Sequence, residues 1–314
     1  MDLLINIGFI LASIVLLYFG AEWMVKGSSS LALRLGMQPV IVGLTIVAFG
    51  TSAPELIVSV DAAMDGKSGI SIGNVVGSNY FNILVILGVT AIMSPIMVDR
   101  RLLKSDIPLM ILATGVFVFL FWDGELTFWE GVILLVGLGL YLISTVYFGR
   151  RKVKLNKIVL PKLPSKGNIF IDLGLLLLGL LVMIGGSRLL VVGGVNIAKT
   201  YDVSDAIIGL TIVSVGTSLP ELATSVMAAV RGKSELAIGN AVGSNMFNIL
   251  GIAGTSAVIR PIGGTDIAGL EFIFLGISAL ILWPLAFTDR KLVRWEGFVL
   301  LLIYVVYMYL RWPR

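Results

Sequence analysis

Residues 41–60 read IVGLTIVAFGTSAPELIVSV, and residues 207–226, which lie 166 positions later, read IIGLTIVSVGTSLPELATSV. The two stretches share fourteen of twenty residues, and their polar residues are among those that match. The same offset aligns ISIGNVVGSNYFNIL (70–84) with LAIGNAVGSNMFNIL (236–250), with eleven identities in fifteen positions. Two apolar helices that were alike only in composition would not match best at their polar positions. The chain therefore contains two copies of one unit in a single register.

The composition of the chain is that of a membrane protein. Hydrophobic residues make up 57% of the 314 residues, charged residues make up 13%, and the mean hydropathy is +1.01. A soluble domain carries about 25% charged residues, so this chain lacks the polar residues that would cover a soluble surface. The first apolar run follows Asp2 rather than a basic segment and has no small-residue cleavage site. We interpret it as a retained helix and not as a signal peptide.

Each copy contains five apolar segments. We expect membrane helices near residues 3–24, 38–65, 69–93, 105–122 and 126–148, and then near 168–191, 204–230, 235–259, 267–287 and 292–311. Because five is odd, the second copy enters the membrane from the opposite side. The sequence thus predicts an all-α polytopic membrane protein with ten transmembrane helices in two inverted-topology repeats, residues 1–149 and 168–314, joined by a short link, residues 150–167. This architecture is typical of secondary transporters, whose site lies at the midplane where the repeats meet.

The distribution of basic residues predicts the orientation of the chain. If the N-terminus lies outside, 17 of the 23 lysines and arginines fall on the inner side, seven of them in the link 150–167. Short cytoplasmic loops carry such an excess. We therefore expect a multi-pass protein of the cell (inner) membrane with both termini extracytoplasmic and the link cytoplasmic. The link could alternatively recruit anionic lipid.

Two carboxylates, Glu55 and Glu221, interrupt apolar spans. A charge at the centre of a membrane helix costs about 3 kcal/mol on insertion scales, so such residues are functional by default. Pro54 and Pro220 each remove a backbone hydrogen bond, so we expect helices 2 and 7 to be broken there. Backbone carbonyls one turn earlier, near Ala48 and Gly50, are then candidates to face a ligand.

Hydroxyl and amide oxygens surround these carboxylates in the sequence. Thr51 and Ser52 precede Glu55 by four and three residues, which predicts that both hydroxyls share its helix face, and Thr217 and Ser218 repeat the arrangement before Glu221. The third segment of each unit adds a polar stripe with a four-residue spacing, namely Asn74, Ser78 and Asn82, matched by Asn240, Ser244 and Asn248. We favour ion ligation for Ser78, Asn82, Ser244 and Asn248. For Asn74 and Asn240, ligation and the bridging of helices are equally open.

Such a site offers only oxygen ligands, because the chain has neither cysteine nor histidine. Hard cations take oxygen ligands, and Ca²⁺ accepts six to eight of them in flexible geometry. Two carboxylates balance one divalent ion, and Na⁺ is nearly the size of Ca²⁺. Competition between the two ions for one site would constitute antiport.

The pair GTSAPEL and GNVVGSNYFNI, repeated as GTSLPEL and GNAVGSNMFNI, resembles the alpha repeats of the cation/calcium exchanger superfamily, which includes the sodium/calcium exchangers and their prokaryotic relatives. The resemblance covers the whole chain. It implies a transporter, not an enzyme, that needs no cofactor, acts as a monomer, and exchanges Ca²⁺ for Na⁺ by alternating access as its first and sixth helices slide across the core. The ion ligands that it implies are Thr51, Ser52, Glu55, Ser78, Asn82, Thr217, Ser218, Glu221, Ser244 and Asn248, with backbone carbonyls at Ala48 and Ser214.

One position departs from the family. Several members carry aspartate where this chain has Asn248, which leaves open the number of Na⁺ ions, a role for K⁺, and the replacement of Na⁺ by H⁺. The absence of the large regulatory loop of animal exchangers indicates a prokaryotic member. The alternatives are a Ca²⁺/H⁺ or K⁺-dependent antiporter and an ion channel, although channels usually arrange ligands by oligomeric symmetry. An intramembrane hydrolase is disfavoured because no base lies near Ser52 or Ser218.

Other charged residues have structural interpretations. Glu22 and Lys26 have the spacing of an intrahelical ion pair, and Arg188 occupies the position that matches Glu22 in the second copy. Glu130 and Glu296 follow a tryptophan at the expected beginnings of helices, where the helix dipole favours a carboxylate.

Overall fold

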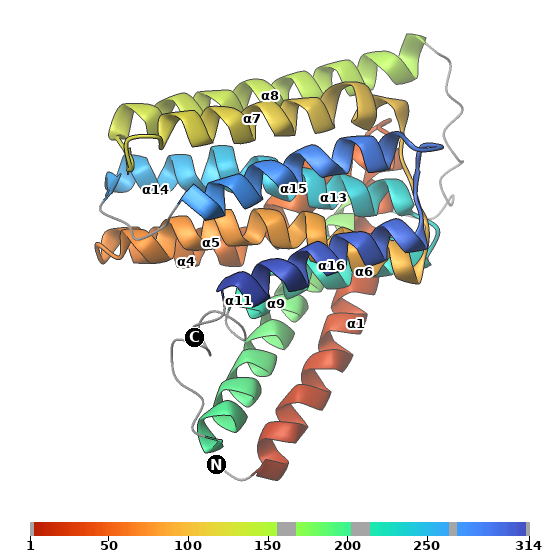
Figure 1. The fold of residues 1–314 in the computed structure, drawn as a ribbon. Helices are drawn as coiled ribbons and strands as arrows, with labels where there is room; N and C mark the ends of the chain where they lie inside the picture. The colour runs from red at the N-terminus through yellow and green to blue at the C-terminus, as the bar shows by residue number, and fades with distance from the viewer. Residues whose placement is uncertain (1–2, 156–167, 202–213, 264–268, 312–314) are drawn as a thin grey trace.

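The computed structural model describes residues 3–155, 168–201, 214–263 and 269–311, which form helices and four short strands. Seven of the described helical segments are long and apolar enough to cross a membrane: Leu3–Arg34, Ser68–Met93, Leu102–Leu120, Phe128–Gly149, Ile169–Thr200, Ser234–Ile259 and Gly269–Phe287. An eighth span results if the bent pair Pro39–Thr51 and Ala53–Met64 is counted as one. The protein is therefore a multi-pass helical membrane protein (Figure 1).

The helices of the first half are α1 (Leu3–Arg34), α2 (Pro39–Val42), α3 (Ala48–Thr51), α4 (Ala53–Met64), α5 (Ser68–Phe81), α6 (Leu87–Met93), α7 (Ile107–Leu120) and α8 (Phe128–Leu155), with π-helical turns η1 (Gly43–Val47), η2 (Asn82–Ile86) and η3 (Leu102–Asp106). The second half contains α9 (Ile169–Thr200), α11 (Ser214–Thr217), α12 (Leu219–Val230), α13 (Ser234–Met246), α14 (Ala253–Ile259), α15 (Gly269–Phe287) and α16 (Arg294–Arg311), with π-helical η5 (Phe247–Ile252). The expected start of the seventh helix, at residue 204, lies outside the described residues.

Several helices continue beyond the apolar runs that predicted them. α1 ends at Arg34 rather than near residue 24, and α9 ends at Thr200 rather than near residue 191. In α1 the hydroxyl of Ser28 donates to the carbonyl of Met24 at 2.7 Å. Because the Ser28 hydroxyl has its hydrogen-bond acceptor inside the helix, this polar residue does not end α1.

α1 and α9 lie side by side, run in opposite directions, and are inclined to the other helices (Figure 1). A Cβ atom on Gly20 would lie 2.8 Å from the carbonyl oxygen of Gly179, and one on Gly179 would lie 2.6 Å from that of Gly20. A Cβ on Gly27 would likewise lie 2.6 Å from the carbonyl oxygen of Asp172. Small residues allow such backbone contact between membrane helices. We call these two helices the α1–α9 pair.

Both helices expected to break are interrupted at a serine. Pro39–Thr51 and Ala53–Met64 meet at a bend of 46°, at Ser52, and Pro54 lies in the first turn of α4. Ser218 likewise separates α11 from α12, and Pro220 lies in the first turn of α12. Proline is tolerated there because the first turn of a helix has no amide partners to lose. The breaks therefore leave the N-terminal ends of two helices inside the protein.

The segments α5–η2–α6 and α13–η5–α14 occupy the centre of the molecule. Within their apolar windows 72% and 83% of the residues are buried, against 22% and 28% in α1 and α9. The π-helical turns begin at Asn82 and Phe247, and Asn248 lies in the second of them. Such turns are frequent at functional sites, and here they contain two of the predicted ligands.

Two antiparallel strand pairs connect the halves of the chain, and the sequence did not predict them. β1 (Ile96–Met97) pairs with β4 (Lys291–Leu292), and β2 (Glu125–Leu126) pairs with β3 (Ile262–Gly263). The 166-residue offset relates β1 to β3 and β2 to β4. The two pairs are thus equivalent under the repeat, and each joins the connection before the fourth expected helix of one half to the connection after the fourth expected helix of the other half.

Candidate functional site

Two buried carboxylates lie at the helix breaks. Glu55 is in the first turn of α4 and Glu221 is in the first turn of α12, and each residue is 1% exposed. The N-terminus of a helix carries a partial positive charge and unpaired amide groups. The breaks therefore stabilise negative charge at the positions where these carboxylates lie.

The carboxylates are joined to the opposite half of the chain by crossed hydrogen bonds. Ser52 Oγ donates to Glu221 Oε1 at 2.9 Å, and Ser218 Oγ donates to Glu55 Oε1 at 2.9 Å. The predicted common helix face of Ser52 and Glu55 thus does not bring their side chains into a hydrogen bond with each other: each serine hydroxyl donates to the carboxylate of the other half.

Several predicted ligand atoms are buried without a hydrogen-bond partner in the described part of the chain. They are Glu55 Oε2, Glu221 Oε2, Asn82 Oδ1, Asn248 Oδ1 and Ser244 Oγ. A buried polar atom without a partner costs about 1–3 kcal/mol, so a concentration of such atoms among predicted ligands indicates a site for a cation. These are the hard oxygen donors that Ca²⁺ and Na⁺ take. The described residues contain no cluster of three or more acidic side chains, so carboxamide and hydroxyl oxygens would have to complete the coordination.

Asn74 and Asn240 connect neighbouring helices. Asn74 Nδ2 donates to the carbonyl of Glu55 at 3.1 Å and to Ser59 Oγ at 2.8 Å. Asn240 Nδ2 donates to the carbonyl of Glu221 at 3.4 Å and to Ser225 Oγ at 3.1 Å. Both asparagines therefore bridge helices, as one of the two alternatives predicted. Each also holds the backbone carbonyl of an acidic residue in place.

The remaining predicted ligands lie in or next to the same region. The Thr51 hydroxyl, which has a single proton, lies within hydrogen-bond distance of two acceptors, Asn240 Oδ1 at 3.2 Å and the carbonyl oxygen of Val47 at 3.1 Å. Ser78 is 5% exposed, and Thr217 ends α11. Ser214 begins α11, and its side chain lies outside the described part of the chain.

The carbonyl of Ala48 is not freed by the break as expected. It accepts a hydrogen bond from the amide of Ser52 at 3.0 Å, because the helical turn continues as far as the break. A carbonyl oxygen has two lone pairs, so this one retains capacity for an ion. Gly243 lies directly against this turn: a Cβ there would lie 2.6 Å from the carbonyl oxygen of Leu44 and 2.8 Å from the Ala48 side chain.

Sequence reasoning missed one supporting residue. Asn245 Oδ1 accepts a hydrogen bond from Asn82 Nδ2 at 3.0 Å, which orients the free Oδ1 of Asn82. The 166-residue offset pairs Asn245 with Asn79, and both are buried. The match between Asn79 and Asn245 in the two copies was a sequence signal for this residue. Neither asparagine belongs to the polar stripe with the four-residue spacing, so the signal was not used.

Glu22 has an ion-pair partner that differs from the one predicted, and two further charged residues also have structural partners. Glu22 forms an ion pair with Arg231 rather than with Lys26, because the end of α12 lies beside α1. Arg34 forms an ion pair with Asp172 inside the α1–α9 pair. Glu130 Oε2 accepts hydrogen bonds from the amide and hydroxyl of Thr127 at 2.8 and 2.7 Å, an N-terminal cap of α8.

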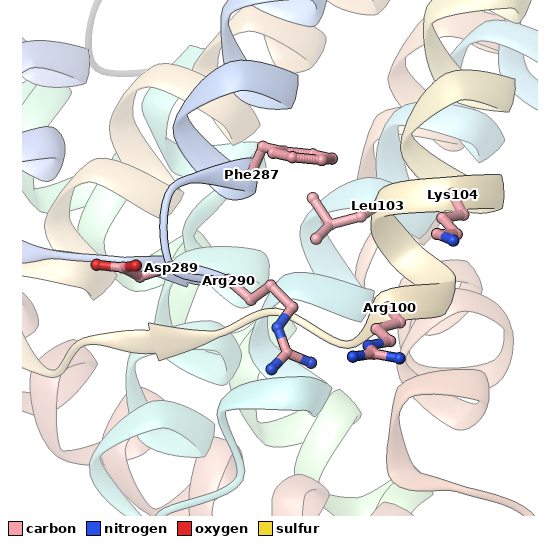
Figure 2. A pocket seen from close by; sticks show the side chains of 6 residues that line it. All are labelled: Arg100, Leu103, Lys104, Phe287, Asp289 and Arg290. Atoms are coloured by element: carbon pink, nitrogen blue, oxygen red, sulfur yellow. The ribbon is translucent and has the colours of Figure 1, made fainter.

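A pocket of about 620 Å³ lies apart from the carboxylates, between the connection before α7 and the end of α15. Its lining residues are Arg100, Leu103, Lys104, Phe287, Asp289 and Arg290. Figure 2 shows Leu103 and Phe287 facing one another, whereas the Arg100 and Arg290 guanidinium groups extend to one side and Asp289 points away. None of the predicted ion ligands lines it.

Comparisons with known proteins show which family the chain is similar to. Residues 5–148 and 171–312 match the family described as "Sodium/calcium exchanger protein". The chain is 40% identical to a protein named "Putative antiporter CaxA" from Alkalimonas amylolytica over 96% of this chain and 97% of that one. It is 32% identical to the sodium/calcium exchanger MaX1 of Methanosarcina acetivorans, over 97% of both chains.

A solved structure has the same fold. The sodium-calcium exchanger NCX_Mj superposes with a TM-score of 0.86 and 34% sequence identity, over 99% of this chain and 100% of that chain. The family match and these relatives cover nearly all of the sequence. The chain belongs to the sodium/calcium exchanger family.

Proposed function

We propose that the protein is a secondary active antiporter that exchanges Ca²⁺ for Na⁺ across the cell membrane. The observation that carries this proposal is the pair of buried carboxylates, Glu55 and Glu221. Each is hydrogen-bonded to a serine of the opposite half, and each has one oxygen without a hydrogen-bond partner among the described residues. Two buried negative charges without a cation are costly. A divalent ion that binds between the halves balances both of them.

The proposed ion ligands are the twelve residues implied by the family motif. Side-chain oxygens come from Thr51, Ser52, Glu55, Ser78, Asn82, Thr217, Ser218, Glu221, Ser244 and Asn248, and backbone carbonyls come from Ala48 and Ser214. When an ion binds, the serine hydroxyls turn their lone pairs to it and the free carboxylate oxygens gain a partner. Na⁺ uses the same oxygens, so binding of one ion displaces the other. That competition couples the two fluxes.

We further propose that the chain consists of two inverted five-helix repeats, residues 1–149 and 168–314, with ten spans in all. The antiparallel packing of α1 against α9 supports this, because the 166-residue offset relates these two helices. So does a pair of contacts that the same offset relates: a Cβ on Gly27 would lie 2.6 Å from the carbonyl oxygen of Asp172, and one on Gly193 would lie 2.9 Å from that of Asn6. The two separately matched segments of the family point the same way.

The α1–α9 pair is the proposed moving part. Its two helices meet backbone to backbone through glycines, so they act as one body. Against the rest of the protein the pair presents flexible thioethers: Thr224 Oγ1 lies 3.8 Å from Met24 Sδ and 3.4 Å from Met183 Sδ. Methionine adapts to shifting surroundings. Sliding of this pair would open the carboxylate site to one side of the membrane and then to the other.

The test is uptake of radiolabelled Ca²⁺ into proteoliposomes that contain the purified protein. The vesicles are loaded in turn with Na⁺, with K⁺, or with a buffer that sets a proton gradient. We expect an outward Na⁺ gradient to drive uptake. Uptake driven by the proton gradient alone would support a Ca²⁺/H⁺ antiporter, and uptake without any counter-ion would indicate a channel.

A further inference from the structure

An ion pair joins the α1–α9 pair to the remaining helices. Glu22 on α1 contacts Arg231, the residue that follows α12. Both side chains are partly exposed, at 33% and 49% respectively. The Glu22–Arg231 ion pair therefore lies at the end of the bundle where the chain passes from α12 to α13.

The positions related to these two by the repeat carry the opposite charges. The 166-residue offset relates Glu22 to Arg188, and it relates Asp65 to Arg231. Glu22 and Arg231 are acid and base, and their counterparts Arg188 and Asp65 are base and acid. The surrounding residues match closely, since AAMDGKS (62–68) lies over AAVRGKS (228–234).

The second pair is not formed in this structure. Asp65 follows α4 and instead forms an ion pair with Lys67 at 2.8 Å, with both side chains more than half exposed. Arg188 is exposed on α9 and forms no ion pair with the residues that the structure describes. The Lys67 ammonium holds the pKa of the Asp65 carboxyl below its usual value, so Asp65 stays charged and available. The molecule thus has one contact closed and its symmetry-related contact open.

In a transporter built from inverted repeats, the two access states differ by an exchange of the roles of the repeats. A contact between positions 22 and 231 in one state is then replaced by a contact between positions 188 and 65 in the other. For a rigid α1–α9 pair this exchange amounts to a slide along its length. Arg188 and Asp65 carry opposite charges and attract each other, and the second contact requires this attraction.

We propose that Glu22–Arg231 and Arg188–Asp65 are alternating ion-pair latches, one closed in each access state of the exchanger. The proposal rests on the proposed antiport function and on the inverted repeat. Each latch ties the α1–α9 pair to the end of the broken helix of one half, α12 or α4. Because exposed ion pairs are weak, and because Asp65 exchanges Lys67 for Arg188, the latches bias the two states without trapping either.

The chain has no cysteine, so cross-linking between introduced cysteines tests this directly. The full-length variants Glu22→Cys/Arg231→Cys and Asp65→Cys/Arg188→Cys are reconstituted in vesicles and treated with a disulfide-forming oxidant. We expect both pairs to cross-link, and each cross-link to cause a loss of Ca²⁺ exchange that a reducing agent restores. Glu22→Cys/Asp65→Cys uses one member of each latch and is expected not to cross-link.

Failure of the latches is distinguishable from failure of the antiport proposal. If the unmodified protein does not exchange Ca²⁺, the function is overturned. If it exchanges Ca²⁺ but Asp65→Cys/Arg188→Cys does not cross-link, the latch proposal alone is overturned. Swapping the two charges is an independent test. Asp65→Arg and Arg188→Asp are each expected to slow Ca²⁺ exchange, and the double variant is expected to restore its rate. Additive losses in the double variant would also overturn the proposal.

Discussion

The carboxylates of Glu55 and Glu221 each accept a hydrogen bond from the other half of the chain and keep one oxygen free. Glu55→Gln and Glu221→Gln are each expected to abolish Ca²⁺ transport while the protein still folds. Each change preserves the side-chain shape but removes one of two charges that balance a divalent ion at low dielectric. The measurement is the initial Ca²⁺ flux per folded transporter.

Glu130→Gln is the matched control, because Glu130 caps α8 through Thr127 and contacts no predicted ligand. It is expected to retain most of the flux. Near-normal flux in either Glu55→Gln or Glu221→Gln would rule out a site that depends on two carboxylates. Loss of folded protein with normal flux per molecule would assign these residues a structural role instead.

A second prediction concerns the crossed hydrogen bonds from Ser52 and Ser218 to the carboxylates. Ser52→Ala and Ser218→Ala are expected to weaken the apparent affinity for Ca²⁺ by about 10- to 100-fold, since a hydrogen bond to a charged group contributes about 1.5–3 kcal/mol. Equilibrium binding of Ca²⁺ to the purified variants checks this. Ser13→Ala is the control, because the hydroxyl of Ser13 is buried but bonds only within its own helix, to the carbonyl of Ile10 at 2.7 Å. Unchanged affinity in both site variants would mean that the crossed bonds do not organise the site.

At the scale of the helices, the glycine contacts between α1 and α9 determine whether these two move as one. Gly179→Ala is expected to lower the free energy of unfolding by about 1–3 kcal/mol, because its Cβ would lie 2.6 Å from the carbonyl oxygen of Gly20 and the backbones must separate. Gly185→Ala, in the same helix, has nothing within 4 Å of its Cβ and is the control. Thermal unfolding of the two variants in detergent measures the difference. Equal stability would show that the close contact is not maintained in the folded protein.

The sequence predicted which helices exist but not where all of them end. Apolar runs identify spans because the hydrocarbon core requires them, and Pro54 and Pro220 identified both breaks. α1 and α9 extend further, and polar residues in each extension have partners on the other helix: Arg34 pairs with Asp172, and Asn196 Nδ2 donates to Asn6 Oδ1 at 3.1 Å. The two-residue strands form only where distant connections meet, so no local pattern indicates them.

The acidic residues of the site were likewise predictable, whereas their partners were not. A carboxylate in an apolar span is visible in one sequence, and so is its repetition. The spacing predicted that Ser52 and Glu55 share a helix face, but it could not indicate that the Ser52 hydroxyl donates to Glu221 of the other half. Glu22 was matched with Lys26 for the same local reason, and it pairs instead with Arg231, which lies 209 residues away. Contacts between the halves depend on tertiary structure, which local spacing does not encode.

At the scale of the whole molecule, the proposed exchange depends on the proposed inverted repeat, in which the two halves enter the membrane from opposite sides. A parallel arrangement would place the breaks at Ser52 and Ser218 in the same orientation, and the crossed bonds between the two helix N-termini would be lost. In the proposed repeat, an odd number of spans in each half produces the inverted arrangement. The same odd number would place the two chain ends on one side of the membrane and the link 150–167 on the other.

The orientation of the chain is tested with reporter fusions in bacterial cells. Alkaline phosphatase, which is active only outside the cytoplasm, is expected to be active when fused after residue 314 and inactive when it replaces the second half after residue 158. A green fluorescent protein, which folds in the cytoplasm, is expected to give the reverse result at both positions. The physical reason is the excess of lysine and arginine in the link, which contains seven of the 23 basic residues and which the positive-inside rule retains in the cytoplasm. If the same reporter is active at both positions, the second half does not cross the membrane an odd number of times, and the ten-span inverted repeat is wrong. If the two results are exchanged, the repeat stands and the orientation alone is reversed.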